Sequence, residues 1–247
     1  MDLIVCATQR CGSTMILEDL RNSRVFGVPE EYFIPWYGEI TNVSDSLKSI
    51  ITRATGPNGI SSVKVMADQL KFIDHKLPSI DVSKDHSFFP NFARFFKEAS
   101  WVYVKRNDVL RQAISRHMAT ETRINHATST ENDCHFAGNL LKNYNTDYNK
   151  GARYDFGKIK SHCANIVIEN ISWENFFRVN NISPLVLIYE EYILNSKFEH
   201  LSAIAELINV NFDFNKTPRR KMVKLSNSLN EDWYFRFLGD LSNFKRC

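Results

Sequence analysis

The stretch from Leu3 to Thr14 constrains the fold of this chain most strongly. An apolar, strand-forming run ends at a polar turn that contains one glycine, Gly12. The residues after the turn are apolar at a spacing that suits a helix buried on one face: Met15, Ile16, Leu17 and Leu20. The pattern predicts a strand, a loop and a helix in direct succession.

A loop between a strand and a helix start favours an anionic ligand. The first N–H groups of the helix and the positive end of its dipole point at whatever lies above the strand end. Arg10 adds a fixed positive charge with a forked set of donors, and Ser13 and Thr14 add hydroxyls. We therefore expect this loop to bind a phosphate group.

Length and composition set broad limits. A chain of 247 residues with 43% hydrophobic residues can bury one substantial core, so we expect a single domain over residues 1–247. The formal net charge of +3 gives no indication of a nucleic-acid partner. Five cysteines without a C-x-x-C pair favour reduced thiols. No signal peptide or membrane span is visible, and we expect a cytoplasmic protein.

Strand and helix patterns alternate along the chain, which predicts an α/β fold with a mainly parallel central sheet flanked by helices. Further strands are expected at 62–66, 101–104 and 184–189, and the principal further helices at 44–54, 157–177 and 197–209. A helix capped by Asn107 or Asp108 should follow the second of these strands. Residues 125–155 are polar with weak periodicity, and we interpret them as an insertion or a lid over the ligand.

Two well-known phosphate loops do not fit. The nucleotide P-loop G-x-x-x-x-G-K-[ST] requires a lysine where this chain has Ser13 after Gly12. The Cys-x5-Arg phosphatase loop fails as well, because Gly12 stands where Cys6 would require the arginine. Cys11 is interpreted as a small residue that fills the turn.

The loop Thr8–Thr14 instead resembles the 5′-phosphosulfate loop of sulfotransferases that use 3′-phosphoadenosine 5′-phosphosulfate (PAPS), in the form Q-R-[STC]-G-[ST]-T. Arg106 at a strand end and Ser115 on the next helix resemble the 3′-phosphate element. The spacing between Arg106 and Ser115 is similar to that in the trehalose 2-sulfotransferase-like family of bacterial carbohydrate sulfotransferases. The sequence Gln112–Ser115 also resembles the core of that family's element. The segment Gly27–Phe33 matches that family's G-x-P-x-E-[FY]-F in outline, so the resemblance covers nearly the whole chain.

The resemblance implies a P-loop-like sulfotransferase fold and transfer of a sulfuryl group from PAPS to a hydroxyl, which releases adenosine 3′,5′-bisphosphate. It implies no metal. Arg10 would stabilise charge on the departing 5′-phosphate. The donor-binding residues that it implies are Gln9, Arg10, Cys11, Gly12, Ser13, Thr14, Arg106 and Ser115.

Glu31 occupies the position of the family's general base, which accepts the proton of the attacking hydroxyl. Its neighbour Glu30 is the weaker candidate, and His117 is a competing base. Lys64, Tyr32 and Phe33 are candidate substrate contacts, although a strand lysine can equally be a solvated residue.

Several questions stay open at the level of sequence. The family often has a glutamate that touches the sugar where this chain has Val28, and this departure argues against trehalose itself as the acceptor. We expect a hydroxyl of a carbohydrate or of another small acceptor. The basic tail, with Arg219, Arg220, Lys221 and Lys224, either assists the 3′-phosphate or is a solvated face. A nucleotide kinase with a degenerate P-loop and a non-catalytic nucleotide-binding protein are the alternative functions. The oligomeric state is open, a homodimer included.

Overall fold

The first strand, β1 (Leu3–Ala7), lies inside the sheet and is buried along its whole length, as its five apolar residues require. A computed structural model describes residues 1–79, 88–129, 139–193, 198–213 and 220–244. By their internal contacts these residues form two compact units. The first contains Met1–Lys105 and Glu169–Arg219, and the second contains Arg106–Ile168 and Arg220–Cys247. The expectation of a single domain stays a prediction.

The first unit is built on a four-stranded sheet in the order β2-β1-β3-β6, with every neighbouring pair parallel. The other strands are β2 (Ser62–Met66), β3 (Ser100–Lys105) and β6 (Leu185–Ile188). Ala7, the last residue of β1, pairs with Met66 on one side and Val104 on the other, so these strands end at the same edge. The predicted fold class, an α/β protein with a parallel sheet, is confirmed.

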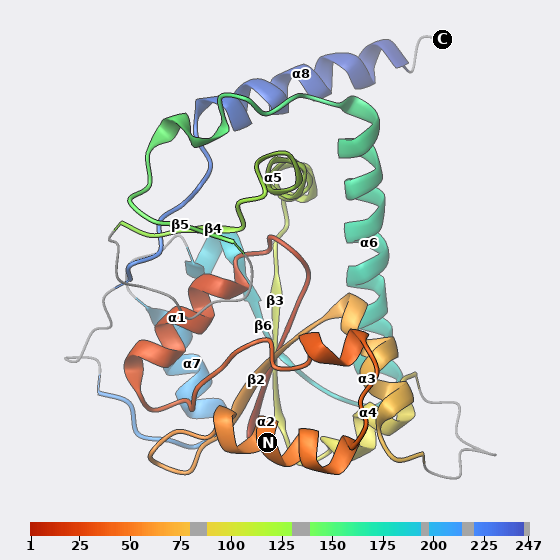
Figure 1. Cartoon of the computed structure of the whole chain (residues 1–247), viewed down its shortest axis with the longest axis vertical. Coiled ribbons are helices and arrows are strands. Elements are labelled where there is room, and N and C mark those ends of the chain that lie inside the picture. The colour runs from red at the N-terminus through yellow and green to blue at the C-terminus, as the bar shows by residue number, and fades with distance from the viewer. Residues whose placement is uncertain (80–87, 130–138, 194–197, 214–219, 245–247) are drawn as a thin grey trace. The chain divides into compact units, whose positions relative to one another are not determined.

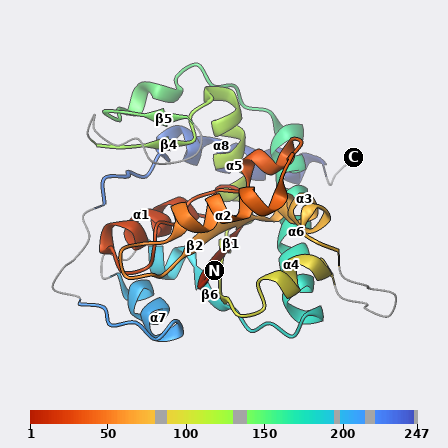
Figure 2. The ribbon, with the colours of Figure 1, turned by 60° about the horizontal axis from the view of Figure 1, so that its bottom comes forward.

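Helices cover both faces of this sheet. In Figure 1, α1 and α7 lie on one side of the strands, and α3, α4 and the end of α6 lie on the other; the turned view in Figure 2 agrees. The helices of the first unit are α1 (Ser13–Ser23), α2 (Val43–Ala54), α3 (Leu70–Lys76), α4 (Pro90–Phe95), α6 (Phe156–Val179) from Glu169 onward, and α7 (Glu199–Leu207). Shorter helical turns are η1 (Ile34–Tyr37), η2 (Ala67–Gln69) and η4 (Tyr189–Ile193).

An aromatic core fixes one face of the sheet. Trp101 and Tyr103, alternate residues of β3, pack against rings from α4 and α6. Since successive strand residues point to opposite faces, Val63 and Val65 join this core, whereas Lys64 points to the face that carries α1.

The second unit is mainly helical. It contains α5 (Val109–Thr122), the first part of α6, and α8 (Ser228–Phe244), with η3 (Thr146–Asn149) and a short parallel pair, β4 (His126–Ala127) and β5 (Leu140–Leu141). Its core consists of apolar side chains from the three helices: Ala113, Ile114, Met118, Ile159, Ile166, Trp233 and Phe237. Asp108 caps α5 by accepting a hydrogen bond from the Arg111 N–H, as predicted.

The predicted insertion at 125–155 contains β4, β5 and η3 and belongs to the second unit. Residues 130–138 lie outside the described residues, and the role of a lid stays a prediction. The stretch is joined to the basic tail, because the Ser129 N–H donates to the Lys221 carbonyl and the Tyr148 hydroxyl donates to the Leu225 carbonyl. Arg219 lies outside the described residues. In the described part of the chain, no helix has the length and apolar character needed to cross a membrane.

Candidate active site

The loop after β1 has the backbone of an anion-binding turn. Arg10 and Gly12 both have positive φ angles, 67° and 97°, and the Cys11 N–H donates to the Thr8 carbonyl, so the chain turns tightly before α1 begins at Ser13. At Gly12 the left-handed conformation favours the residue without a Cβ. Gly12 is also the N-cap of α1, and a glycine has no side chain with which to occupy the first-turn N–H groups. No acidic residue lies in that first turn, so the site suits a negative ligand.

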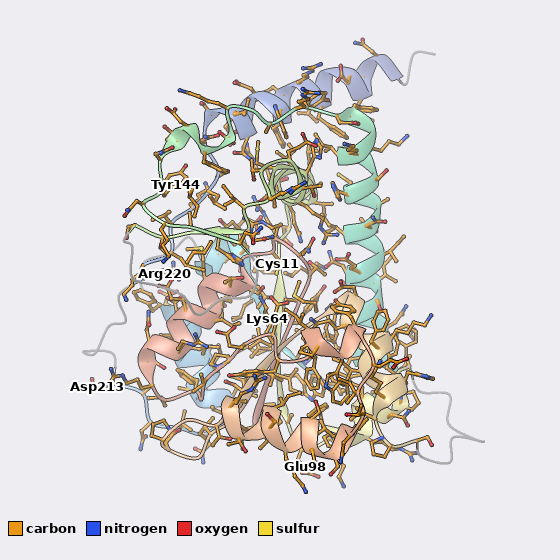
Figure 3. The ribbon with its side chains drawn as sticks, in the orientation of Figure 1. Cys11, Lys64, Glu98, Tyr144, Asp213 and Arg220 are labelled. Carbon is orange, nitrogen blue, oxygen red and sulfur yellow. The ribbon has the colours of Figure 1, made fainter. Side chains whose placement is uncertain are left out.

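Lys64 connects this loop to the predicted base. Its ammonium group lies 2.5 Å from Glu31 Oε1 and donates to Thr14 Oγ1 at 3.4 Å. The Lys64 side chain is only 3% exposed, so the ion pair is poorly screened by solvent. Figure 3 labels Lys64, on β2, and Cys11, in the loop. The contact brings a carboxylate, an ammonium and a hydroxyl together at the start of α1.

Residues 27–32 are held against β2 by backbone contacts, which fix the position of Glu31. A Cβ on Gly27 would lie 2.7 Å from the Ile60 carbonyl oxygen, so only glycine fits. The Lys64 N–H donates to the Glu30 carbonyl at 2.9 Å, and this bond ties the segment to β2. The Tyr32 hydroxyl donates to the Val28 carbonyl at 2.8 Å, which closes the turn.

Glu30 and Glu31 are neighbours with different partners. Glu30 forms an ion pair with Arg21, on α1, and burial raises the pKa of the Glu30 carboxyl, although the charges of Arg21 and Lys64 oppose the shift. Glu31 instead pairs with Lys64, whose ammonium group also donates to Thr14 at the start of α1. The two acids therefore have different cationic partners, and Lys64 links Glu31 to the start of α1.

The structure places the other residues predicted in this unit as follows. Ser13 and Cys11 are buried within the turn, and Gln9 is exposed. The Cys6 thiol is buried in β1, and burial raises its pKa well above the usual value, which disfavours a thiolate nucleophile. Phe33 is buried against Trp36 and Phe96, so its ring has no surface for a substrate in this conformation.

Arg106 and Ser115, the predicted 3′-phosphate residues, both belong to the second unit. Arg106 directly follows β3, and Ser115 lies in the middle of α5; both side chains are partly exposed. Gln112, from the same motif, is fully buried in the helix. The assignment of Arg106 and Ser115 to a phosphate stays a prediction.

His117, the competing base, lies in the core of the second unit. Its side chain is fully buried, its Nε2 lies 3.0 Å from the Arg153 carbonyl oxygen, and its ring packs 5.4 Å from that of Trp233. A carbonyl oxygen can only accept, so Nε2 carries a proton and donates it there. Packing and this hydrogen bond account for His117 as a structural residue.

One buried polar pair was not predicted. His200 Nε2, on α7, lies 2.9 Å from Asp19 Oδ2, on α1, and both side chains are completely buried. The pair joins the helix behind the anion loop to α7. The two residues are 181 positions apart, and nothing in the sequence indicates that they meet. Among the described residues, no three His, Cys, Asp or Glu side chains form a group that could hold a metal ion.

A parallel α/β sheet whose first strand leads through a glycine turn into a helix is an arrangement that favours an anionic ligand at the carboxyl edge of the strands. The absence of the P-loop lysine separates it from nucleotide-hydrolysing relatives of similar design. The chain matches the model of the Stf0 sulphotransferase family over residues 2–240 and belongs to that family. The resemblance inferred from the motifs is thereby confirmed, and the protein is a transferase of sulfuryl groups. A comparison with curated proteins gave no match.

Proposed function

We propose that this protein transfers a sulfuryl group from PAPS to a hydroxyl of a small acceptor, most simply a carbohydrate, and releases adenosine 3′,5′-bisphosphate. The observation that carries the proposal is the contact of Lys64 with both Glu31 and Thr14. It puts a carboxylate that can take a proton next to a loop built for a phosphate. Sulfuryl transfer to an alcohol requires both features.

The loop fits the phosphosulfate end of the donor. The positive φ angles at Arg10 and Gly12 belong to a tight turn between β1 and α1, and the start of α1 adds its partial positive charge. Thr14 and the guanidinium of Arg10 supply further donors. From the family resemblance, we assign the 3′-phosphate of the same ligand to Arg106 and Ser115. When bound, PAPS supplies the electrophilic sulfur and a phosphate leaving group.

Glu31 acts as the general base in this proposal. Its carboxylate accepts the proton of the acceptor hydroxyl as that oxygen becomes nucleophilic. Lys64 keeps Glu31 in place and, as a buried cation, lowers the cost of gathering negative charge at the start of α1. Arg10 stabilises the charge that develops on the departing phosphate. Orientation of donor and acceptor supplies the rest of the rate enhancement.

Calorimetry separates this proposal from a nucleotide kinase. We expect adenosine 3′,5′-bisphosphate to bind in the absence of magnesium, and to bind at least tenfold more tightly than ADP with magnesium. Preference for magnesium-ADP would overturn the proposal in favour of the kinase. Tight binding of the bisphosphate, with no release of it from PAPS in any acceptor mixture, would favour the non-catalytic alternative.

A further inference from the structure

A buried indole on the long helix α6 contacts the strand end from which the anion loop starts. Trp173 Nε1 donates to the Ala7 carbonyl oxygen at 2.9 Å, and both residues are completely buried. Ala7 is the last residue of β1, and Thr8 is the first residue of the loop. The indole therefore holds the peptide group at which the strand becomes the loop.

The aromatic core keeps this indole in one position. Its ring stacks on that of Phe177, with centroids 5.6 Å apart and planes 14° apart, and it meets Phe176 edge-on at 5.7 Å. All three rings belong to the core of the first unit. Close packing leaves a large side chain no room to change its rotamer, so the N–H group of Trp173 is a fixed donor.

The fixed donor also sets how the chain enters the loop. A peptide group is planar and trans, so the Thr8 N–H points away from the direction of the Ala7 carbonyl. The next carbonyl, that of Thr8, accepts a hydrogen bond from the Cys11 N–H at 3.3 Å. Two consecutive carbonyls therefore have assigned partners, one in the core and one in the turn.

The loop needs anchors of this kind because its backbone is strained. Arg10 has a φ of 67°, a conformation that residues with a side chain rarely adopt. Such a conformation persists only where the surrounding structure holds it. On the helix side of the loop, the buried pair of Asp19 and His200 joins α1 to α7. The end of α6 and α7 lie on opposite sides of the sheet (Figure 1), so the strand end and the helix after the loop are held from different faces.

We infer that Trp173 is a positioning residue for the anion loop. It touches neither donor nor acceptor, and it acts through the Ala7 carbonyl. Its hydrogen bond keeps the loop in the conformation that binds the 5′-phosphate of the donor and stabilises the charge that develops there. Preorganised donors are effective only at the correct distance from that charge. The inference rests on the proposed function, because it takes the 5′-phosphate of PAPS as the ligand of the loop.

The experiment uses Trp173→Phe, which keeps an aromatic ring and removes the donor. Calorimetry compares adenosine 3′,5′-bisphosphate with adenosine 3′-phosphate, which has no 5′-phosphate for the loop to bind. We expect the Kd of the bisphosphate to rise about tenfold, while the Kd of adenosine 3′-phosphate stays within about twofold. A loss that is specific to the 5′-phosphate distinguishes positioning of the loop from a general weakening of the core.

Trp36→Phe is the matched control. Trp36 is completely buried in the same unit, and its Nε1 donates to the Ser46 hydroxyl at 2.9 Å. The same substitution therefore removes an equivalent hydrogen bond that does not involve the anion loop. Both variants should lower the Tm by similar amounts, measured on the calorimetry samples, and Trp36→Phe should keep the wild-type affinity for both nucleotides.

Equal losses of affinity for the two nucleotides in Trp173→Phe, or no loss for either, would overturn the positioning role. So would the same selective loss in Trp36→Phe. In each case, tight binding of the bisphosphate by the wild type still upholds the proposed function. If Trp173→Phe does not fold, Phe177→Leu removes the stacking partner and keeps the indole. That variant should weaken bisphosphate binding alone, by about threefold, and an absence of selective loss would overturn the inference. Failure of the wild type to bind the bisphosphate would overturn the proposed function itself.

Discussion

Ionisable side chains have different surroundings in the two units. In the first unit, Glu31 meets Lys64 beside a glycine turn, at a strand edge where ligands of parallel sheets bind. In the second, His117 donates to a backbone carbonyl and packs beside Trp233 in an apolar core. A base must reach the proton that it removes, and Glu31 is the partly exposed group of the two. The difference favours Glu31 over His117 for the proposed role of general base.

The largest effect should follow from Glu31→Gln. The amide keeps the size of the side chain but cannot take a proton, so turnover should fall by about 10²- to 10⁴-fold. Affinity for adenosine 3′,5′-bisphosphate, measured by calorimetry, should stay within about twofold. Glu30→Gln is the matched control, because Glu30 pairs with Arg21, and it should cost far less turnover. Equal losses in both variants would remove Glu31 from the role of base.

Arg106→Ala should have the next largest effect, because it tests whether the second unit binds the donor. Loss of a charge-assisted hydrogen bond, about 1.5–3 kcal/mol, should weaken adenosine 3′,5′-bisphosphate binding by about 10- to 100-fold. Adenosine 5′-phosphate, which lacks the 3′-phosphate, should lose much less affinity. The control is Arg111→Ala, since Arg111 pairs with Glu231 within the same unit. Similar losses for the two nucleotides would contradict a 3′-phosphate site at Arg106.

His117→Phe should leave turnover within about threefold of wild type. The ring still fills the space beside Trp233, but the hydrogen bond to the Arg153 carbonyl is lost. That loss corresponds to roughly 1 kcal/mol, or about 2–4 °C in Tm for a chain of this size. Turnover and thermal melts are measured on the same sample. A large loss of turnover at an unchanged Tm would instead assign the role of general base to His117.

The smallest expected effect is the pH dependence of the contribution that Glu30 makes to the free energy of unfolding. Because burial raises the pKa of Glu30 above its usual 4.5, the folded protein holds this proton more tightly than the unfolded chain does. The contribution of Glu30 to the free energy of unfolding therefore falls as pH rises from about 4.5 through the raised pKa. Glu30→Gln lacks this contribution, so the difference in Tm between wild type and variant should decline across that window. A constant difference would contradict the shift.

Local chemistry made much of the fold predictable. The strands at 62–66 and 101–104 and the helix at 44–54 agree with β2, β3 and α2 to within one residue at each end, because apolar periodicity and turn residues act over short distances. Several short elements were not predicted. α3 has only seven residues, and β4 and β5 have two each, too few for a period to emerge.

The sequence by itself determined the anion loop and the glycines on which the site depends. The backbone favours glycine at position 12, where φ is positive, and requires it at Gly27, where a Cβ would lie too close to a carbonyl oxygen. Both glycines can be read directly from the sequence motifs. Only the tertiary structure decided what the side chains do. Whether Glu30 or Glu31 meets Lys64 depends on how β2 pairs beside β1, and the contact of Asp19 with His200 depends on α1 and α7 lying together. Such contacts join residues distant in sequence, so they arise only when the sheet and its helices have packed.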